Sequence, residues 1–159
     1  MKKKFGIELK WAFIFIGISL LWMVLERLTG LHDKYISKHI IYTNLFAIPA
    51  IIIFVLALLD KRKNFYNNKL SWLDGFLAGL VISIIITVFS PLTQLITIKV
   101  ITPDFFPNMI NYVVESGKMS QENAEDYFNL TNYMMQSALG GLLMGAITSA
   151  IVALFVRKK

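Results

Sequence analysis

The sequence contains no cysteine and few charged residues. Without cysteine, disulfide bonds, zinc–thiolate sites and thiol nucleophiles are all excluded. Only 16% of the 159 residues are charged, which is too few to cover the surface of a soluble domain, where about 25% is usual. Hydrophobic residues make up 56% of the chain and stand in long blocks. The composition therefore indicates a single membrane-embedded domain.

Motifs for phosphate binding and for common hydrolytic reactions are also missing. The chain has no glycine-rich phosphate loop, no HExxH and no GxSxG. Its net charge of +6 would suit a nucleic-acid partner, but the placement of the basic residues has another explanation, given below. We therefore predict no nucleic-acid partner, no cofactor and no metal centre.

Four apolar segments are long enough to cross a bilayer as helices. A crossing helix needs about 20 mainly apolar residues, and lipid demands that the backbone satisfy its own hydrogen bonds. The predicted fold is all-α: a polytopic membrane protein with four transmembrane helices. The spans are expected at about residues 6–28, 40–59, 72–98 and 133–156. Between Ser71 and Asp74 the sequence has the form of a capping box that opens the third span.

Basic residues gather on one side of this predicted topology. Eleven of the 16 lie at the two termini and near the loop between spans two and three: Lys2, Lys3, Lys4, Lys10, Lys61, Arg62, Lys63, Lys69, Arg157, Lys158 and Lys159. Most acidic residues lie on the other side. Because basic loops stay in the cytoplasm, we predict a bacterial cytoplasmic (inner) membrane protein with both termini inside. Attraction to the lipid bilayer explains the basic excess.

Small residues recur at every fourth position on two spans. The third span carries Gly75, Gly79 and Ser83, and the fourth carries Ser137, Gly141, Gly145 and Ser149. Helices in lipid pack closely through such residues. We predict that these two ladders face each other within one chain. The alternative is a seam between two copies in a homo-oligomer.

The region of about residues 103–132 is the largest segment outside the predicted spans. Pro107 and Gly117 are expected to begin and end one amphipathic helix, and Ser120 to cap a second. The sequence thus predicts an outer helical hairpin between spans three and four.

Polar side chains gather near the outer ends of the spans, where they form a candidate polar pocket. Its members are Glu26, His32, Asp33, His39, Asn44, Gln94 and Gln136. Ionisable groups inside a membrane are costly and often functional. One interpretation is a metal site made by the two histidines with Glu26 and Asp33. A second is a site for a small solute, a lipid headgroup or protons, and the third, which we favour, is simple pairing of wetted residues at span ends.

Several stretches resemble a known bacterial family. They are Leu31-His32-Asp33-Lys34, the segment from Tyr42 to Pro49, the segment from Pro103 to Pro107, and Tyr127-Phe128-Asn129-Leu130. Together they resemble the membrane family catalogued as domain of unknown function 4199. The resemblance covers nearly the whole chain and implies a four-span bacterial membrane protein. It implies no activity and no catalytic residues.

Three functions remain open at this point. The first is a non-enzymatic helical bundle that acts through partners or oligomers. The second is a small transporter or channel with an outward-facing polar pocket, which requires a continuous polar path. The third is an outer-surface membrane enzyme, which requires Glu26, His32, Asp33 and His39 to lie within a few ångströms of one another.

Overall fold

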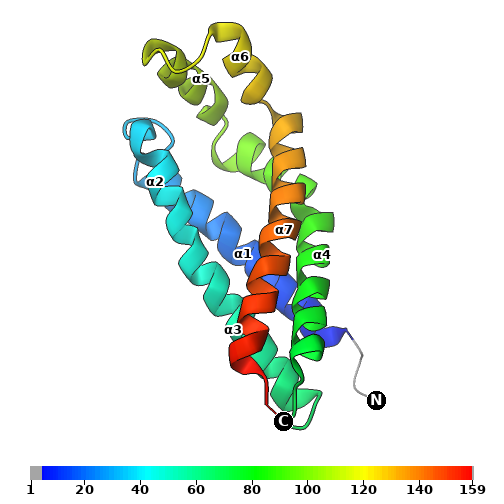
Figure 1. Ribbon diagram of the computed structural model, residues 1–159. Helices are drawn as coiled ribbons and strands as arrows, with labels where there is room; N and C mark the ends of the chain where they lie inside the picture. Colours follow the sequence, from blue (N-terminus) through cyan, green and yellow to red (C-terminus); the bar gives the residue numbers. More distant parts are fainter. Residues whose placement is uncertain (1–4, 159) are drawn as a thin grey trace.

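The computed structural model describes residues 5–158 and consists of helices (Figure 1). The long helices are α1 (Gly6–Leu28), α3 (Ala47–Asn64), α4 (Trp72–Ile96) and α7 (Leu130–Val156). Shorter elements connect them: η1 (Ile36–Lys38), α2 (His39–Thr43), η2 (Asn44–Phe46), the π-helical turn η3 (Thr97–Ile101), α5 (Phe105–Glu115) and α6 (Gln121–Tyr127). Within the described part of the chain the only β-type pairing is a bridge between Leu70 and Lys158.

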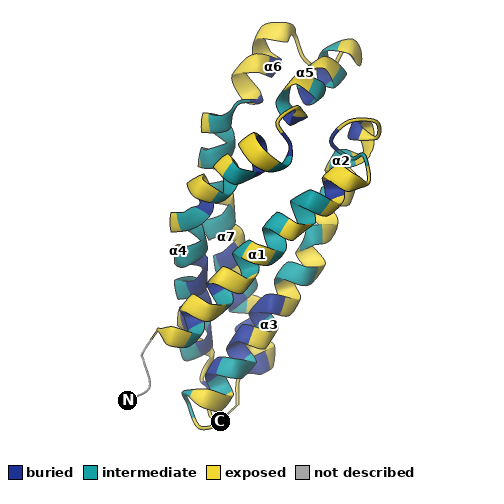
Figure 2. Ribbon diagram, turned by 180° about the vertical axis from the view of Figure 1, so that it is seen from behind, coloured by how far each residue is buried: buried dark blue, intermediate teal, exposed yellow. Residues whose placement is uncertain are grey.

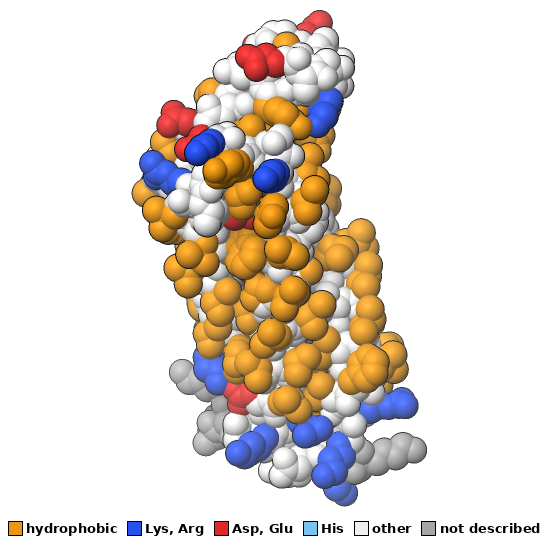
Figure 3. All heavy atoms as spheres, turned by 90° about the vertical axis from the view of Figure 1, so that its left-hand side faces the viewer, with side chains coloured by type: hydrophobic (Ala, Val, Ile, Leu, Met, Phe, Trp, Pro, Cys, Tyr) orange, Lys and Arg blue, Asp and Glu red, His pale blue; other side chains and the backbone are white. Residues whose placement is uncertain are grey.

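This confirms the predicted all-α class and the four helices long and apolar enough to cross a membrane. By length and composition the candidate spans are Gly6–Leu28, Ile36–Asn64, Trp72–Ile101 and Leu130–Val156. All four long helices carry exposed large apolar side chains, and on the face shown in Figure 3 these form an apolar belt across the middle of the molecule. Exposing an apolar surface of this size to water is unfavourable, and contact with lipid hydrocarbon would avoid that exposure.

Two proline residues modify the spans without ending them. Pro49 has no backbone N–H for the Leu45 carbonyl, and the tight turn η2 directly precedes α3. Pro91 likewise leaves the Thr87 carbonyl without its helical donor, and the Ser90 hydroxyl donates to that carbonyl at 2.9 Å. Helix α4 therefore continues past Pro91 into η3.

Side-chain caps fix where the helices begin. Ser71 accepts a hydrogen bond from the Asp74 N–H at 3.1 Å, as the capping box predicts. Asn129 caps α7 in the same way, accepting from the Asn132 N–H at 2.9 Å, so that helix begins at Leu130 rather than near residue 133. Helix α5 begins at Phe105, two residues before the predicted start at Pro107. Proline is tolerated there because the first-turn N–H groups have no helical partner.

The tightest helix contact is between α4 and α7. A Cβ atom added at Gly145 would lie 2.7 Å from the Ser83 Cβ, and one at Gly79 would lie 2.6 Å from the Ser149 Cβ. The two small-residue ladders thus meet in the half of the molecule near the chain termini. Buried residues concentrate in that half (Figure 2). The apolar core there includes Ala12, Phe54, Leu58, Ile82, Val152 and Ala153.

Farther along, the ladder of α7 no longer lies against the α4 ladder. A Cβ atom at Gly141 would meet nothing within 4 Å, and the Ser137 hydroxyl donates to the Met134 carbonyl of its own helix. The space beyond is covered by α5 and α6, which pack on each other at the end of the molecule opposite the termini (Figure 1). A second apolar cluster, including Phe105, Met109, Val113 and Phe128, joins these two helices to Ile36 and Ile98.

Charged residues differ between the two ends of the bundle. The basic end, as we name it, carries Lys10, Lys61, Arg62, Lys63, Lys69, Arg157 and Lys158 (Figure 3). Its elements are tied together, since Lys10 pairs with Asp60 and Arg62 donates to the Val156 carbonyl at 2.8 Å. Lys2, Lys3, Lys4 and Lys159, which we counted on the same side, lie outside the described residues. The opposite end, formed by α5, α6 and the loop after α1, is named the hairpin end.

The α4–α7 contact generates a stability prediction. Gly145→Ala places a methyl group against Ser83 and should lower the free energy of unfolding in detergent by about 1–3 kcal/mol, as overpacking does. Adding Ser83→Gly removes the obstructing side chain and should restore part of the loss.

Gly141→Ala is the matched control, because the same methyl group on the same ladder meets open space. It should be neutral or slightly stabilising, since alanine favours a helix over glycine. Equal destabilisation by both substitutions would contradict the contact. If Gly145→Ala abolished an oligomer without lowering the free energy of unfolding, the ladder would instead form an interface between two copies.

Candidate functional site

Three of the predicted polar residues meet at the hairpin end of α1. Helix α1 ends in a Schellman motif: Gly30 takes a φ of +79°, its N–H donates to the Arg27 carbonyl at 3.0 Å, and the Leu31 N–H donates to the Glu26 carbonyl at 2.9 Å. Glycine suits this left-handed conformation because it lacks a Cβ. The motif turns the chain back over the last turn of α1, and His32 is thereby brought to the Glu26 side chain.

The carboxylate of Glu26 is shared among three ring nitrogens. Its Oε1 accepts from the Trp22 Nε1–H at 2.6 Å. Its Oε2 lies 3.0 Å from the His32 Nε2 and 3.6 Å from the His39 Nδ1. The side chains of Glu26 and His32 are only 2% and 3% exposed, and that of His39 is 13% exposed. One buried carboxylate therefore faces two imidazoles, and we call these three residues the Glu–His cluster.

Helix α5 covers this cluster. The Phe105 ring at the start of α5 packs against both imidazoles, with centroid distances of 5.1 Å to His32 and 5.0 Å to His39. The Asn108 side-chain amide donates to the His32 backbone carbonyl at 3.0 Å. These contacts come from a segment more than 60 residues away in sequence, and they hold the His32 loop against α5.

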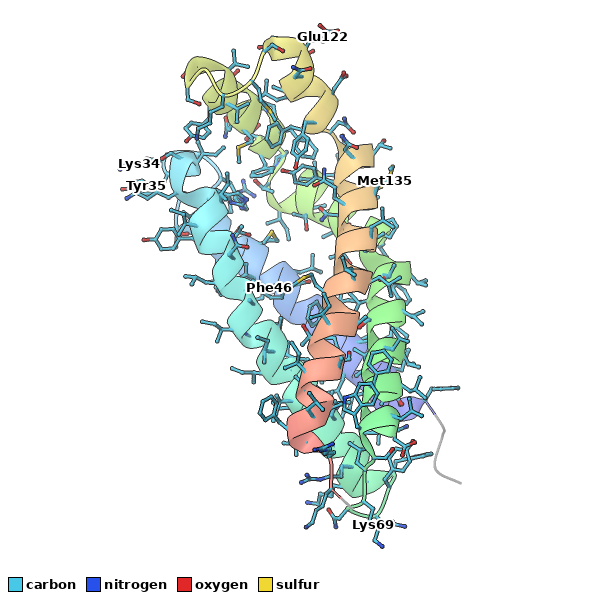
Figure 4. The ribbon with its side chains drawn as sticks, in the orientation of Figure 1. Lys34, Tyr35, Phe46, Lys69, Glu122 and Met135 are labelled. Atoms are coloured by element: carbon cyan, nitrogen blue, oxygen red, sulfur yellow. The ribbon has the colours of Figure 1, made fainter. Side chains whose placement is uncertain are left out.

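A cavity of about 200 Å³ lies beside the cluster, between the hairpin ends of the long helices. It is lined by Met23, His32, His39, Thr43, Gln94, Thr97, Ile98, Thr102, Phe105 and Tyr133. The π-helical turn η3 supplies Thr97 and Ile98 to its wall. Figure 4 shows α1 and α3 diverging from α4 and α7 in this half of the molecule.

The other predicted members of the pocket are distributed differently. Gln94 lines the cavity with the two histidines. Asp33 is exposed and accepts from the Lys34 N–H. Asn44 is also exposed and donates to the Ile40 carbonyl of its own helix at 2.6 Å. Gln136, exposed as well, accepts from the Tyr127 hydroxyl at 3.3 Å. The structure thus joins Glu26, His32, His39 and Gln94 around one space and leaves Asp33, Asn44 and Gln136 outside it.

Several residues around the cluster were not among the predicted members. Trp22 lies one helical turn before Glu26, and this spacing of four residues was the available signal for their hydrogen bond. Phe105, Thr97 and Tyr133 come from distant segments, and no local pattern relates them to Glu26.

A second, wider hollow is lined in part by Glu26. It has a volume of about 540 Å³ and is lined mainly by apolar and aromatic side chains. Its members are Trp22, Leu25, Glu26, Thr29, Leu31, Tyr35, Lys38, Tyr42 and Leu45. Glu26 therefore stands between this hollow and the cavity that holds the imidazoles.

The chemistry of the cluster is that of a cation site. A carboxylate and two imidazoles accept protons or coordinate metal ions. Their ligand atoms, one from each residue, all lie within 4.8 Å of one another. The chain has only two histidines, and both stand here.

Comparison with known proteins gives the chain a family but no activity. Residues 10–158 match the family described as "Protein of unknown function (DUF4199)", and the chain belongs to that family. Neither the search of curated proteins nor the search of solved structures found a match. The earlier resemblance is thereby confirmed.

A different buried pair lies near the basic end, and its chemistry is structural. Lys61 on α3 donates to the Glu8 carboxylate on α1 at 2.8 Å, with both side chains 4% exposed. The Lys61 ammonium also lies 3.8 Å from the centroid of the Phe65 ring. The lysine is the ion-pair partner of this acid, so the pair joins α1 to α3 and is explained by structure alone.

Breaking this pair should cost far more than breaking its exposed neighbour. Glu8→Gln deprives the buried ammonium of its carboxylate and should lower the free energy of unfolding by about 3–5 kcal/mol. Lys10→Gln breaks the Lys10–Asp60 pair, in which the lysine side chain is 53% exposed, and should cost about 0–1 kcal/mol.

Denaturation of the purified protein in mixed micelles measures both effects. Glu8→Gln combined with Lys61→Met removes both charges and should be more stable than Glu8→Gln alone. A double variant as unstable as the single one would contradict the ion pair as the origin of the loss.

Proposed function

We propose that this protein is a non-enzymatic integral protein of the bacterial cytoplasmic membrane, with both termini in the cytoplasm, and that the cavity under its outer hairpin binds a small cationic ligand from the outer side. One observation carries the proposal: the Glu26 carboxylate is buried, and the ion-pair partners found for it in the described residues are the two imidazoles of His32 and His39. Imidazoles are neutral or charged according to their surroundings, so the negative charge of Glu26 is available to a cation.

The distribution of charge supports the proposed orientation. Lysine and arginine crowd the basic end, whereas the hairpin end carries most of the acids, among them Asp104, Glu115, Glu122, Glu125 and Asp126. Short basic segments stay on the cytoplasmic side of a membrane. The lipid bilayer is thus the first partner of this chain, and the hairpin with its cavity belongs to the outer leaflet.

The size and cover of the cavity support a small ligand. About 200 Å³ is below the range of roughly 300–1,000 Å³ in which drug-sized ligands bind. Phe105 and the rest of α5 lie over the imidazoles, so a lipid or peptide substrate has no room to reach them. This favours a binding role over the enzyme acting on such substrates.

A binding role is also favoured over a channel. The ladder hydroxyls that a polar path would need are held by their own helices: Ser83 donates to the Gly79 carbonyl at 3.0 Å and Ser149 to the Gly145 carbonyl at 2.6 Å. Both residues are buried in the α4–α7 contact. The space that contains His32 and His39 therefore ends before it reaches the basic end.

Cysteine labelling tests the orientation and the cavity together, because the natural chain has no cysteine to give background. Thr43→Cys, in the cavity wall, should react with a small water-soluble methanethiosulfonate added outside intact spheroplasts. Glu122→Cys on α6 should react from the same side, and Lys63→Cys at the basic end only after the membrane is opened.

Val88→Cys is the matched control. Val88 is 68% exposed on α4, but its place in the apolar belt puts it in lipid, where a thiol does not ionise and does not react. Labelling of Lys63→Cys from outside would overturn the orientation. Failure of Thr43→Cys to react from either side, with Glu122→Cys reacting, would overturn an outward-open binding cavity.

A further inference from the structure

We propose that the Glu–His cluster is a binding site for a divalent transition-metal ion of the zinc class, coordinated by Glu26, His32 and His39. The inference rests on the proposed cation-binding function and names the ligand for it. It follows from the geometry of three side chains, from the group that orients the carboxylate, and from the types of ligand atom present.

The distances agree with a zinc coordination shell. Zinc bonds to nitrogen and oxygen are about 2.0–2.1 Å long, so neighbouring ligands in a tetrahedral site stand about 3.3 Å apart. The Glu26 Oε2 lies 3.0 Å from the His32 Nε2 and 3.6 Å from the His39 Nδ1, on either side of that value. All ligand atoms of the set lie within 4.8 Å of one another, so no pair exceeds the tetrahedral separation by more than about 1.5 Å.

The carboxylate is oriented as metal-binding carboxylates are. Trp22 holds the Glu26 Oε1 by a 2.6 Å hydrogen bond, which leaves Oε2 directed at the imidazoles. Hydrogen bonds of this kind from a neighbouring side chain fix the geometry of a ligand and raise metal affinity. The Asn108 amide and the Phe105 ring hold the His32 loop from the other side. The three ligands come from α1, from the loop after it and from α2, so their arrangement needs the folded chain.

A bound ion would satisfy a buried nitrogen atom that pairing among the three side chains leaves without a partner. The His39 Nδ1 is buried without a hydrogen-bond partner, because 3.6 Å to the Glu26 Oε2 is too long for one. Coordination would satisfy this nitrogen. The cavity beside His32 and His39 has room for a water molecule as the fourth ligand, as at zinc sites that have three protein ligands.

The ligand set also selects the class of ion. Two imidazole nitrogens and one carboxylate suit zinc, cobalt or nickel, whereas calcium and magnesium prefer oxygen ligands alone. Soft copper(I) favours cysteine and methionine sulfur, whereas the three residues of the cluster supply only nitrogen and oxygen, with Met23 in the wall of the adjoining cavity. With neutral imidazoles the cluster carries one negative charge, which a divalent ion overcompensates by one unit.

Metal titration of the intact protein tests the site. The full chain is purified in detergent with a tag free of histidine, stripped with a chelator, and titrated with Zn²⁺ by calorimetry. Co²⁺ is added in parallel, since tetrahedral cobalt absorbs visible light. We expect one Zn²⁺ per chain and a tetrahedral cobalt spectrum. Nuclear magnetic resonance of ¹⁵N-histidine should show both imidazoles shifting together, because the chain has no other histidine.

Variants separate coordination from surface binding. His32→Asn and His39→Asn each remove a ligand and should weaken Zn²⁺ binding by at least about 100-fold. Trp22→Phe keeps the ligands but loses the orienting hydrogen bond, and should weaken binding by about 10–100-fold. Asp33→Asn is the matched control, because it removes an exposed carboxylate next to His32 that is not in the cluster, and it should bind as the natural chain does.

Two results would overturn the metal site. One is a natural chain that binds Zn²⁺ no more tightly than His32→Asn/His39→Asn, which would leave the cluster as a buried ion pair. The other is an equal loss in Asp33→Asn, which would place the ion on the surface. Labelling of Thr43→Cys is independent of metal, so an open cavity without zinc would refute this inference and leave the cation-binding proposal standing with a different ligand.

Discussion

The architecture depends on one close approach, that of α4 to α7 in the half of the bundle near the termini. Lipid gives helices no hydrophobic drive to associate, so they are held by van der Waals contact at short range. Gly79 and Gly145 allow that range because each lies against a serine of the partner helix. Farther along the ladder, a Cβ atom at Gly141 would meet no neighbour within 4 Å. Helices α4 and α7 stay side by side, whereas α1 and α3 diverge from them toward the hairpin end, so the bundle is closed at the basic end and open at the hairpin end (Figure 1).

The space between the helices at the hairpin end would be unfavourable if no side chain filled or covered it. The backbone is irregular at this end, with the Schellman turn at Gly30, the tight turn before α3 and the π-helical turn after α4. The Schellman turn brings His32 to the gap, the π-helical turn brings Thr97 and Ile98, and Phe105 of α5 also lines it. In a membrane, irregular backbone is tolerated only where protein or a cavity surrounds it. The cavity therefore accounts for the irregular turns, and the turns shape the cavity wall.

Much of the fold followed from the sequence, because lipid imposes simple rules on length and charge. The all-α class, the four long apolar helices and the Ser71 cap required only local patterns. The start of α7 was missed because Asn129 was not recognised as a cap.

The site was harder to predict. Glu26, His32 and His39 were chosen for their residue types, and Asp33 was chosen with them for the same reason. Asp33 follows His32 directly but lies on the exposed side of the loop. Phe105 and Thr97 reach the cluster through tertiary structure, which has no signature in a local stretch of sequence.

The two buried acids of α1 show how the same residue type is used in different ways. Glu8 faces Lys61, and the pair fastens α1 to α3 near the basic end. Glu26 stands about five helical turns farther along and faces two imidazoles instead. Burial of an uncompensated carboxylate is costly. An imidazole compensates the charge only when it carries a proton or shares a metal ion with the carboxylate. In the proposed cation site a bound ion supplies the compensating charge for Glu26, beside a cavity and an orienting tryptophan, whereas Glu8 has its partner Lys61 within the chain.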